Sequence, residues 1–145
     1  MLQFILYVIV ARSLTVVENG YFVMGLLLAN SLCNLLLLGL NSSNIYFYNS
    51  KGIALKFLWS VNKKYFIFAL IFIYPVLFLA VEFYGGVAFP NVPSETLVLS
   101  IFLSIFILLN QFIYSLYQAI GKFTTYNVYM VTNLFTQVFS VLMLV

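Results

Sequence analysis

The sequence predicts an all-α integral membrane protein, an antiparallel bundle of about five transmembrane helices. The composition is the first reason: 65% of the 145 residues are hydrophobic and only 6% are charged. Soluble domains carry about 25% charged residues, so this chain has too few polar groups to cover a surface in water. The mean hydropathy of +1.14 agrees with that class. The third observation is that the apolar residues fall into runs of about 20, the length that crosses a bilayer as a helix.

The first apolar run covers residues 1–11 and stops at Arg12. As a helix it extends about 16 Å, roughly half of the hydrocarbon core. No positive charge precedes the run and no small-residue cleavage site follows it, which argues against a signal peptide. We expect the C-terminal half of a truncated membrane helix, with a short interfacial helix as the alternative. In the loop that follows, Thr15 and Glu18 have the spacing of a capping box.

The second run, residues 20–48, predicts one helix of about 43 Å, longer than the hydrocarbon core of about 30 Å. Gly25, Ala29 and Cys33 recur at every fourth position, a pattern that allows helices to approach closely in lipid. Four amides fall within an arc of about 80° on this helix: Asn30, Asn34, Asn41 and Asn44. A one-sided amide stripe predicts that this face meets a neighbouring helix or a water-filled path rather than lipid.

Residues 49–64 change character, because they contain lysine but no acidic residue. The cations are Lys51, Lys56, Lys63 and Lys64. Trp59 and the flanking tyrosines suit a membrane interface. We expect a short cytoplasmic loop, partly helical, that lies along the headgroups. Its lysines would fix the topology, and the alternative is that they bind anionic lipid or an anionic substrate.

Residues 65–84 predict a further span, which Pro75 should kink because proline removes one backbone hydrogen bond. The Gly-Gly and Pro residues of 85–95 predict a loop. Ser94 is the expected cap of the next helix, and Glu95 lies in its first turn.

Residues 96–120 and 126–145 predict two more spans, each with its own polar stripe. The first stripe lies within an arc of about 100° and consists of Ser100, Ser104, Gln111, Ser115, Gln118 and Lys122. The second consists of Tyr126, Tyr129, Asn133, Thr136, Gln137 and Ser140. Together with the stripe of residues 20–48, these faces predict a shared polar cavity suited to an uncharged polar solute such as a sugar. The alternative is that buried amides only hold helices together, at about 0.6 kcal/mol each.

The lysines also predict the orientation of the chain. The loop at 49–64 and the turn at 121–125 leave the membrane on the same side in this arrangement, and both carry lysine. By the positive-inside rule that side is cytoplasmic. The opposite side carries Arg12 and the three glutamates.

Several kinds of chemistry have no residues to support them. The chain has no histidine, no aspartate and one cysteine, so neither a usual metal site nor a Ser-His-Asp triad can form from it. No Gly-rich phosphate loop is present, and nothing beyond the lysines favours nucleic acid. We therefore expect a protein that is not an enzyme and needs no cofactor.

Four short motifs carry a family resemblance. They are Ala11-Arg12-Ser13-Leu14 with Glu18-Asn19-Gly20-Tyr21-Phe22, then Gly39-Leu40-Asn41, Asn49-Ser50-Lys51-Gly52, and Gln118-Ala119-Ile120-Gly121-Lys122-Phe123 followed by Asn127. In order and spacing they resemble the first periplasmic turn, the second helix with its cytoplasmic loop, and the helix four to five turn of polysaccharide and O-antigen flippases. These belong to the multidrug/oligosaccharidyl-lipid/polysaccharide exporter superfamily.

The resemblance implies a fragment of the N-terminal lobe of an inner-membrane flippase that moves lipid-linked oligosaccharide outward by alternating access. Its partners would be membrane lipids, the lipid-linked oligosaccharide, and the remaining half of the transporter or another copy of the chain. Arg12 and Lys122 are the candidates for binding the diphosphate headgroup. The substrate-path candidates are Asn30, Asn34, Asn41, Asn44, Gln111, Ser115, Gln118, Asn133 and Gln137.

Two other classes remain open from the sequence. A small four-helix-type transporter or flippase that works as an oligomer has a comparable length. A membrane scaffold or accessory subunit that transports nothing would use the amides only to join helices. Access of water to the polar stripes separates a transporter from a scaffold.

Overall fold

The computed structural model describes Val8 and residues 12–122, 124, 127–128 and 130–131. Every regular element in these ranges is helical. In chain order they are α2 (Val16–Leu37), α3 (Leu40–Lys51), α4 (Leu55–Phe68), the π-helical turn η1 (Ala69–Ile73), α5 (Tyr74–Ala88) and α6 (Ser94–Ala119).

Three helical segments in the described part of the chain are long and apolar enough to cross a membrane: Val16–Leu37, Leu55–Ala88 and Ser94–Ala119. The chain is thus a multi-pass helical membrane protein, and its described residues contain three candidate spans rather than the five predicted for the whole chain. The predicted helices 1–11 and 126–145 fall almost wholly outside those residues.

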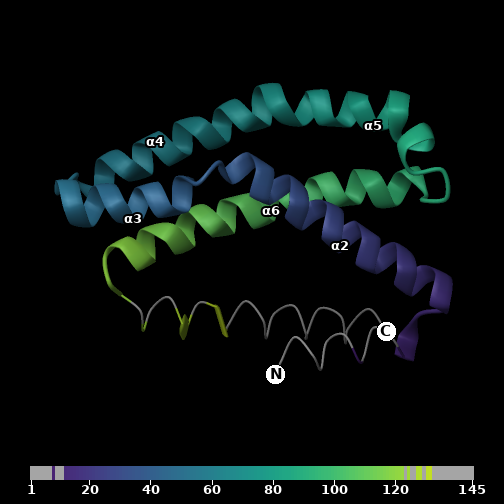
Figure 1. Ribbon diagram of the computed structural model, residues 1–145, viewed down its shortest axis with the longest axis horizontal. Helices are drawn as coiled ribbons and strands as arrows, with labels where there is room; N and C mark the ends of the chain where they lie inside the picture. Colours follow the sequence, from purple (N-terminus) through teal and green to yellow (C-terminus); the bar gives the residue numbers. More distant parts are fainter. Residues whose placement is uncertain (1–7, 9–11, 123, 125–126, 129, 132–145) are drawn as a thin grey trace.

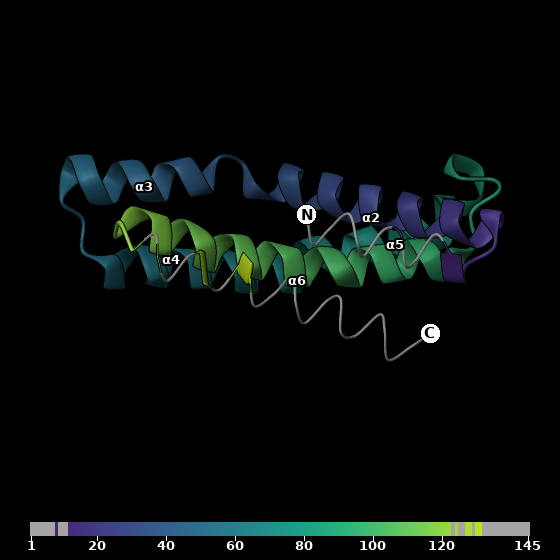
Figure 2. The ribbon, with the colours of Figure 1, turned by 90° about the horizontal axis from the view of Figure 1, so that it is seen from below.

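Helix α6 is the centre of the bundle, since it contacts α2, α3, α4 and α5. The α4–η1–α5 rod runs along one side of it, and α2 crosses it on another (Figure 1). Turned by 90°, the molecule shows α3 in a different layer from α4 and α6 (Figure 2). The apolar core lies where these rods meet and is formed by Cys33, Leu37, Ala69, Tyr74, Ile101, Leu108 and Phe112.

Small residues form the contact between α2 and α6, the most extensive contact in the bundle. Ala29 and Cys33 are buried, as is Leu37 one turn later. A Cβ atom added at Gly25 would lie 3.2 Å from the Ser100 Oγ. The repeat of Gly25, Ala29 and Cys33 therefore gives the close approach that the sequence predicts.

The predicted helix 20–48 is two helices rather than one. Leu38 and Gly39 both adopt left-handed backbone conformations, with φ of 46° and 76°. This ends α2 at Leu37, and α3 starts at Leu40 in a new direction. As a result the four asparagines of this segment do not share one continuous stripe.

The predicted basic loop 49–64 is mostly helical. Helix α3 continues to Lys51, and α4 begins at Leu55, so only residues 52–54 connect them. From Leu55 the helical rod runs without interruption to Ala88. At about 1.5 Å per residue, these 34 residues extend about 51 Å, so part of the rod projects beyond the hydrocarbon.

A π-helical turn lies directly before Pro75, and the kink predicted at this proline stays a prediction. The amide of Tyr74 donates to the carbonyl of Ala69, five residues back, instead of four. The turn also sets the register against α6. Tyr65 contacts the Phe112 ring, and Tyr74 shares a hydrogen bond with Ser104. Between these two contacts lie nine residue steps of the rod but only eight of α6. The extra residue of the π turn absorbs that difference.

The remaining loop and caps agree with the sequence in part. Thr15 and Glu18 form the predicted capping box of α2. The predicted loop 85–95 is shorter, because α5 continues through Gly85 and Gly86 to Ala88. Helix α6 has Pro93 rather than Ser94 at its N-cap position, and Ser94 makes no capping hydrogen bond.

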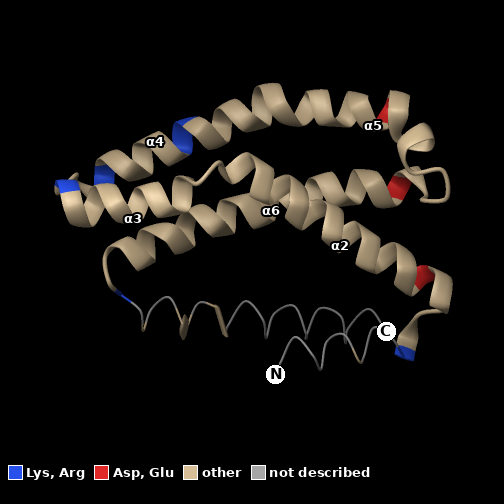
Figure 3. Ribbon diagram, in the orientation of Figure 1, with Lys and Arg blue, Asp and Glu red and all other residues tan. Residues whose placement is uncertain are grey.

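Charged residues gather at the two ends of the bundle (Figure 3). The lysines of α3 and α4 lie at the end where these helices meet, and Lys122 follows α6 at the same end. The glutamates of α2, α5 and α6 lie at the other end, together with Arg12. This separation agrees with the predicted grouping of the lysines.

Candidate functional site

A cluster of neutral polar side chains lies between α3 and α6, toward the lysine end of the bundle. Asn44 Nδ2 donates a hydrogen bond of 2.8 Å to Ser115 Oγ, and both side chains are buried. The Ser115 hydroxyl in turn donates to the carbonyl of Phe112 at 2.9 Å. One turn away, Asn41 Nδ2 donates to Gln111 Oε1 at 3.3 Å. These contacts tie α3 to α6 through amide and hydroxyl groups alone.

The local sequence explains the pairing. Asn41 and Asn44 are three residues apart on α3, while Gln111 and Ser115 are four apart on α6. Both spacings place side chains on one helix face, one turn apart. Because the partner numbers rise together, α3 and α6 run in the same direction here, and each amide meets a polar group of the other helix.

Helix α4 adds a residue that the sequence analysis did not select. Asn62 is 1% exposed, and neither its Oδ1 nor its Nδ2 has a hydrogen-bond partner. The Oδ1 of Asn41 is also buried and without a partner. The signal for Asn62 is its spacing from Leu58 and Tyr65, which places it on the inner face of a helix that otherwise displays lysine.

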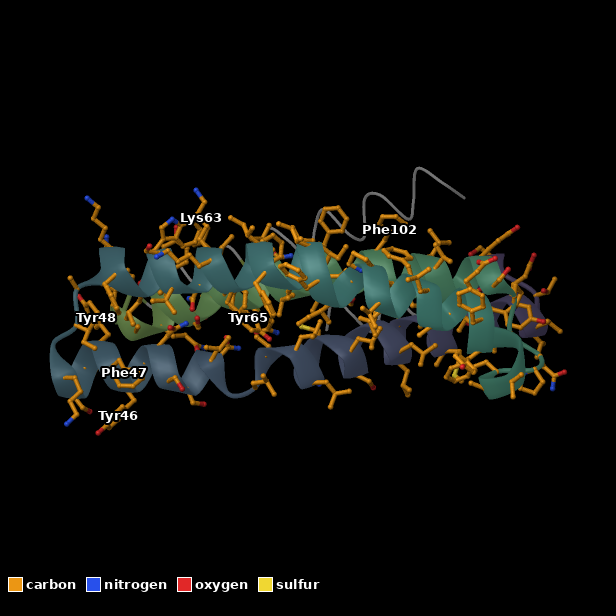
Figure 4. The ribbon with its side chains drawn as sticks, turned by 90° about the horizontal axis from the view of Figure 1, so that it is seen from above. Tyr46, Phe47, Tyr48, Lys63, Tyr65 and Phe102 are labelled. Carbon is orange, nitrogen blue, oxygen red and sulfur yellow. The ribbon has the colours of Figure 1, made fainter. Side chains whose placement is uncertain are left out.

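Tyr65 shows how α4 is fixed against this region. Its side chain points into the space between the layers, whereas Lys63, two residues earlier, points out of the bundle (Figure 4). The Tyr65 hydroxyl donates to the carbonyl of Leu36 at 2.5 Å. The Tyr65 ring lies edge-on to Phe112, with centroids 6.0 Å apart.

Other predicted path residues take no part in these hydrogen bonds. Asn30 is exposed and donates to the carbonyl of Leu26 in its own helix at 2.8 Å. Asn34 is exposed on α2, and Gln118 is half-buried near the end of α6. Asn133 and Gln137 lie outside the described residues. That any of these residues lines a substrate path stays a prediction.

The two predicted headgroup residues are far apart. Arg12 and Lys122 are both exposed and lie at opposite ends of the bundle (Figure 3). In this arrangement they cannot bind one diphosphate together.

A groove of about 210 Å³ opens between α2 and α6 near the glutamate end. Its walls are mostly apolar, and Gly25, Thr96 and Ser100 line it together with larger side chains. The groove and the polar cluster therefore lie at different ends of α6. Within the described residues, no group of three or more His, Cys, Asp or Glu side chains could hold a metal ion.

The arrangement can exchange hydrogen bonds with a neutral polar group, and the side chains that form it carry no charge. No family model, curated protein or solved structure matches the chain. The site itself is therefore the basis for any functional assignment.

Proposed function

We propose that this chain is part of a transporter that moves a lipid-linked oligosaccharide outward across the inner membrane by alternating access. The observation that carries the proposal is the neutral amide and hydroxyl cluster buried between α3 and α6. Amides and hydroxyls bind sugar hydroxyls in either direction, as donors or as acceptors. The flippase-like motifs of the sequence support the same assignment.

The position of the cluster also supports the proposal. It lies toward the end that carries the lysines, which the positive-inside rule assigns to the cytoplasm. The sugar of a lipid-linked substrate would meet this end first, and its phosphates would meet the lysines. Alternating access needs two bodies that rock about a site. The chain would therefore work with the rest of a longer transporter or with another copy of itself.

A non-transporting scaffold is the second candidate, and one observation favours it. The Asn44 amide donates a hydrogen bond to Ser115 across the α3–α6 contact, which is how amides join helices in lipid. In a scaffold, this pair would contribute to stability and to nothing else.

The test is transport in proteoliposomes by the whole purified transporter of which this chain is part. A fluorescent lipid-linked oligosaccharide is incorporated, and a membrane-impermeant reductant then bleaches only the outer leaflet. The proposal expects bleaching to continue beyond the outer leaflet at a rate that rises with protein content. Bleaching that stops at the level of protein-free vesicles would overturn the proposal.

Matched variants separate the two candidates. Asn44→Ala removes the inter-helix hydrogen bond, and Asn49→Ala removes an exposed amide that bonds only to the carbonyl of Ile45 in its own helix. For a transporter, N44A slows bleaching more than its loss of thermal stability explains, while N49A does not. For a scaffold, N44A changes only the midpoint of thermal unfolding.

A further inference from the structure

Asn62 is an amide buried in a membrane protein with nothing in the described chain to bind it. Its side chain is 1% exposed, and both of its polar atoms lack a hydrogen-bond partner. Buried polar side chains are nearly always hydrogen-bonded to protein or to ordered water. An amide left without partners in a low-dielectric interior is especially unfavourable.

The helix register places Asn62 beside the polar cluster. Tyr65 contacts Phe112, and the rod of α4 and α5 runs antiparallel to α6. One turn back on α4 and one turn forward on α6 place Asn62 at the level of Ser115 along the bundle. Ser115 is also the hydrogen-bond partner of Asn44. Asn62 thus lies on a third helix at the level of the α3–α6 cluster.

A second group without a partner lies one turn away. Asn41 pairs through its Nδ2 with Gln111, but its Oδ1 is buried and unpartnered. Gln111 precedes Ser115 by four residues, which corresponds to about 6 Å along the axis of α6. Two acceptor oxygens and one NH₂ group, which has two N–H donors, therefore remain open within a short length of the same three-helix contact.

The chemistry of these three groups selects their ligand. A cation would satisfy the two oxygens and be repelled by the NH₂ group of Asn62, and an anion would do the reverse. A water molecule both donates and accepts, and buried waters typically make about three hydrogen bonds. We propose that α3, α4 and α6 enclose an internal water site in which a short chain of waters hydrogen-bonds Asn62 and the Oδ1 of Asn41.

Bound water would do for these amides what a dry core cannot. The waters of the site keep the amides of all three helices hydrogen-bonded at the lysine end of a bundle that is otherwise apolar. Water held there can also be exchanged for another hydroxyl-bearing group without leaving the amides unpaired. The proposal does not require that the chain transports anything.

Three variants of Asn62 test the site by the order of their thermal stabilities in nanodiscs. With bound water, Asn62→Leu expels the water and leaves Asn41 Oδ1 unpaired, so its unfolding midpoint falls. Asn62→Ala leaves room for water, so its midpoint falls less. In a dry core the order of the two midpoints reverses, because leucine removes two unpaired groups and fills the space that alanine would leave. The proposal is overturned if the unfolding midpoint of N62L equals or exceeds that of N62A. It is also overturned if the midpoint of N62L equals or exceeds that of the unaltered protein.

A direct measurement uses protein labelled with ¹⁵N at asparagine. The side-chain amide of Asn62, assigned from its loss in N62L, should show magnetisation transfer from water, while the Ser115-bonded amide of Asn44 should not.

Asn30→Leu serves as the control for the thermal-stability series, since the Asn30 amide is exposed and bonds within its own helix. Equal transfer to Asn62 and Asn44, or transfer to neither, would contradict a local water site.

Discussion

The hydroxyl of Tyr65 in α4 donates a hydrogen bond to the backbone carbonyl of Leu36 in the last turn of α2. The carbonyl needs this donor because α2 ends at Leu37 and offers no amide one turn further on. A side chain from a neighbouring helix thus satisfies a group that the helix break exposes. The contact joins the break to the rod that carries Asn62.

The first prediction removes this hydroxyl. Tyr65→Phe should lower the free energy of unfolding by about 1–3 kcal/mol, the cost of leaving a buried acceptor unpaired. Thermal unfolding in nanodiscs measures the change. Tyr84→Phe is the control, because Tyr84 is exposed at the other end of the rod. Equal effects of Y65F and Y84F would contradict the role of the hydrogen bond.

The second prediction concerns the π turn. Deleting Phe72, an exposed residue of η1, should convert the turn to α-helix without changing the register on either side. The deletion alone should cost about 3 kcal/mol, because Pro75 then lies inside an ordinary α-helix. Pro75→Ala should recover most of that loss when it is added to the deletion. Thermal unfolding of the two single variants and the double variant gives the coupling, and additive effects would contradict it.

The third prediction concerns the break between α2 and α3. Leu38 is 78% exposed and has φ of 46°, a conformation that costs a non-glycine residue about 1 kcal/mol or more. Leu38→Gly should therefore raise the free energy of unfolding by about 1 kcal/mol. Leu38→Ala keeps the Cβ atom and should not. If both variants unfold at the same temperature, φ at this position is not strained.

The fourth prediction tests the small-residue contact of α2 with α6. Gly25→Leu should destabilise the protein by about 1–3 kcal/mol, since the larger side chain has no room beside Ser100 and Thr96. Gly20 lies on the same helix with nothing within 4 Å of an added Cβ atom. Gly20→Leu should be neutral or stabilising by up to about 1 kcal/mol. Equal losses in the two variants would show that Gly25 is not held closely.

The fifth prediction concerns orientation. In a Cys33→Ala background, Lys56→Cys and Glu95→Cys place single thiols at opposite ends of the bundle. In intact cells an impermeant maleimide should label Glu95→Cys from outside and should reach Lys56→Cys only after the membrane is opened. Labelling of Lys56→Cys in intact cells would reverse the assignment of the lysine end to the cytoplasm.

Features set by neighbouring residues could be predicted from the sequence. The capping box of Thr15 and Glu18 depends on a three-residue spacing, and the repeat of Gly25, Ala29 and Cys33 depends on helical period. The polar face of α6 follows from that period as well. Ser100, Ser104 and Ser115 are all buried on it.

Features set by contacts between helices could not be predicted. The break at Leu38 has no local signal beyond a single glycine, and leucine is a strong helix former. The π turn follows in part from Pro75, but its one-residue shift is fixed by the match of Tyr74 to Ser104. The sequence predicts that Asn62 belongs to a basic loop. Its burial depends on packing between helices, which no local pattern shows. The lysines around it belong to the opposite face of the same helix.

Cys33 gives the α2–α6 contact its own chemical reporter. It is the one cysteine of the chain, and it is almost completely buried in the core that also contains Tyr74 and Ile101. A small thiol reagent can reach it only while α2 is separated from this core. The rate of thiol modification in the unaltered protein therefore measures how often that contact opens. The measurement can be made in any lipid and with any solute added.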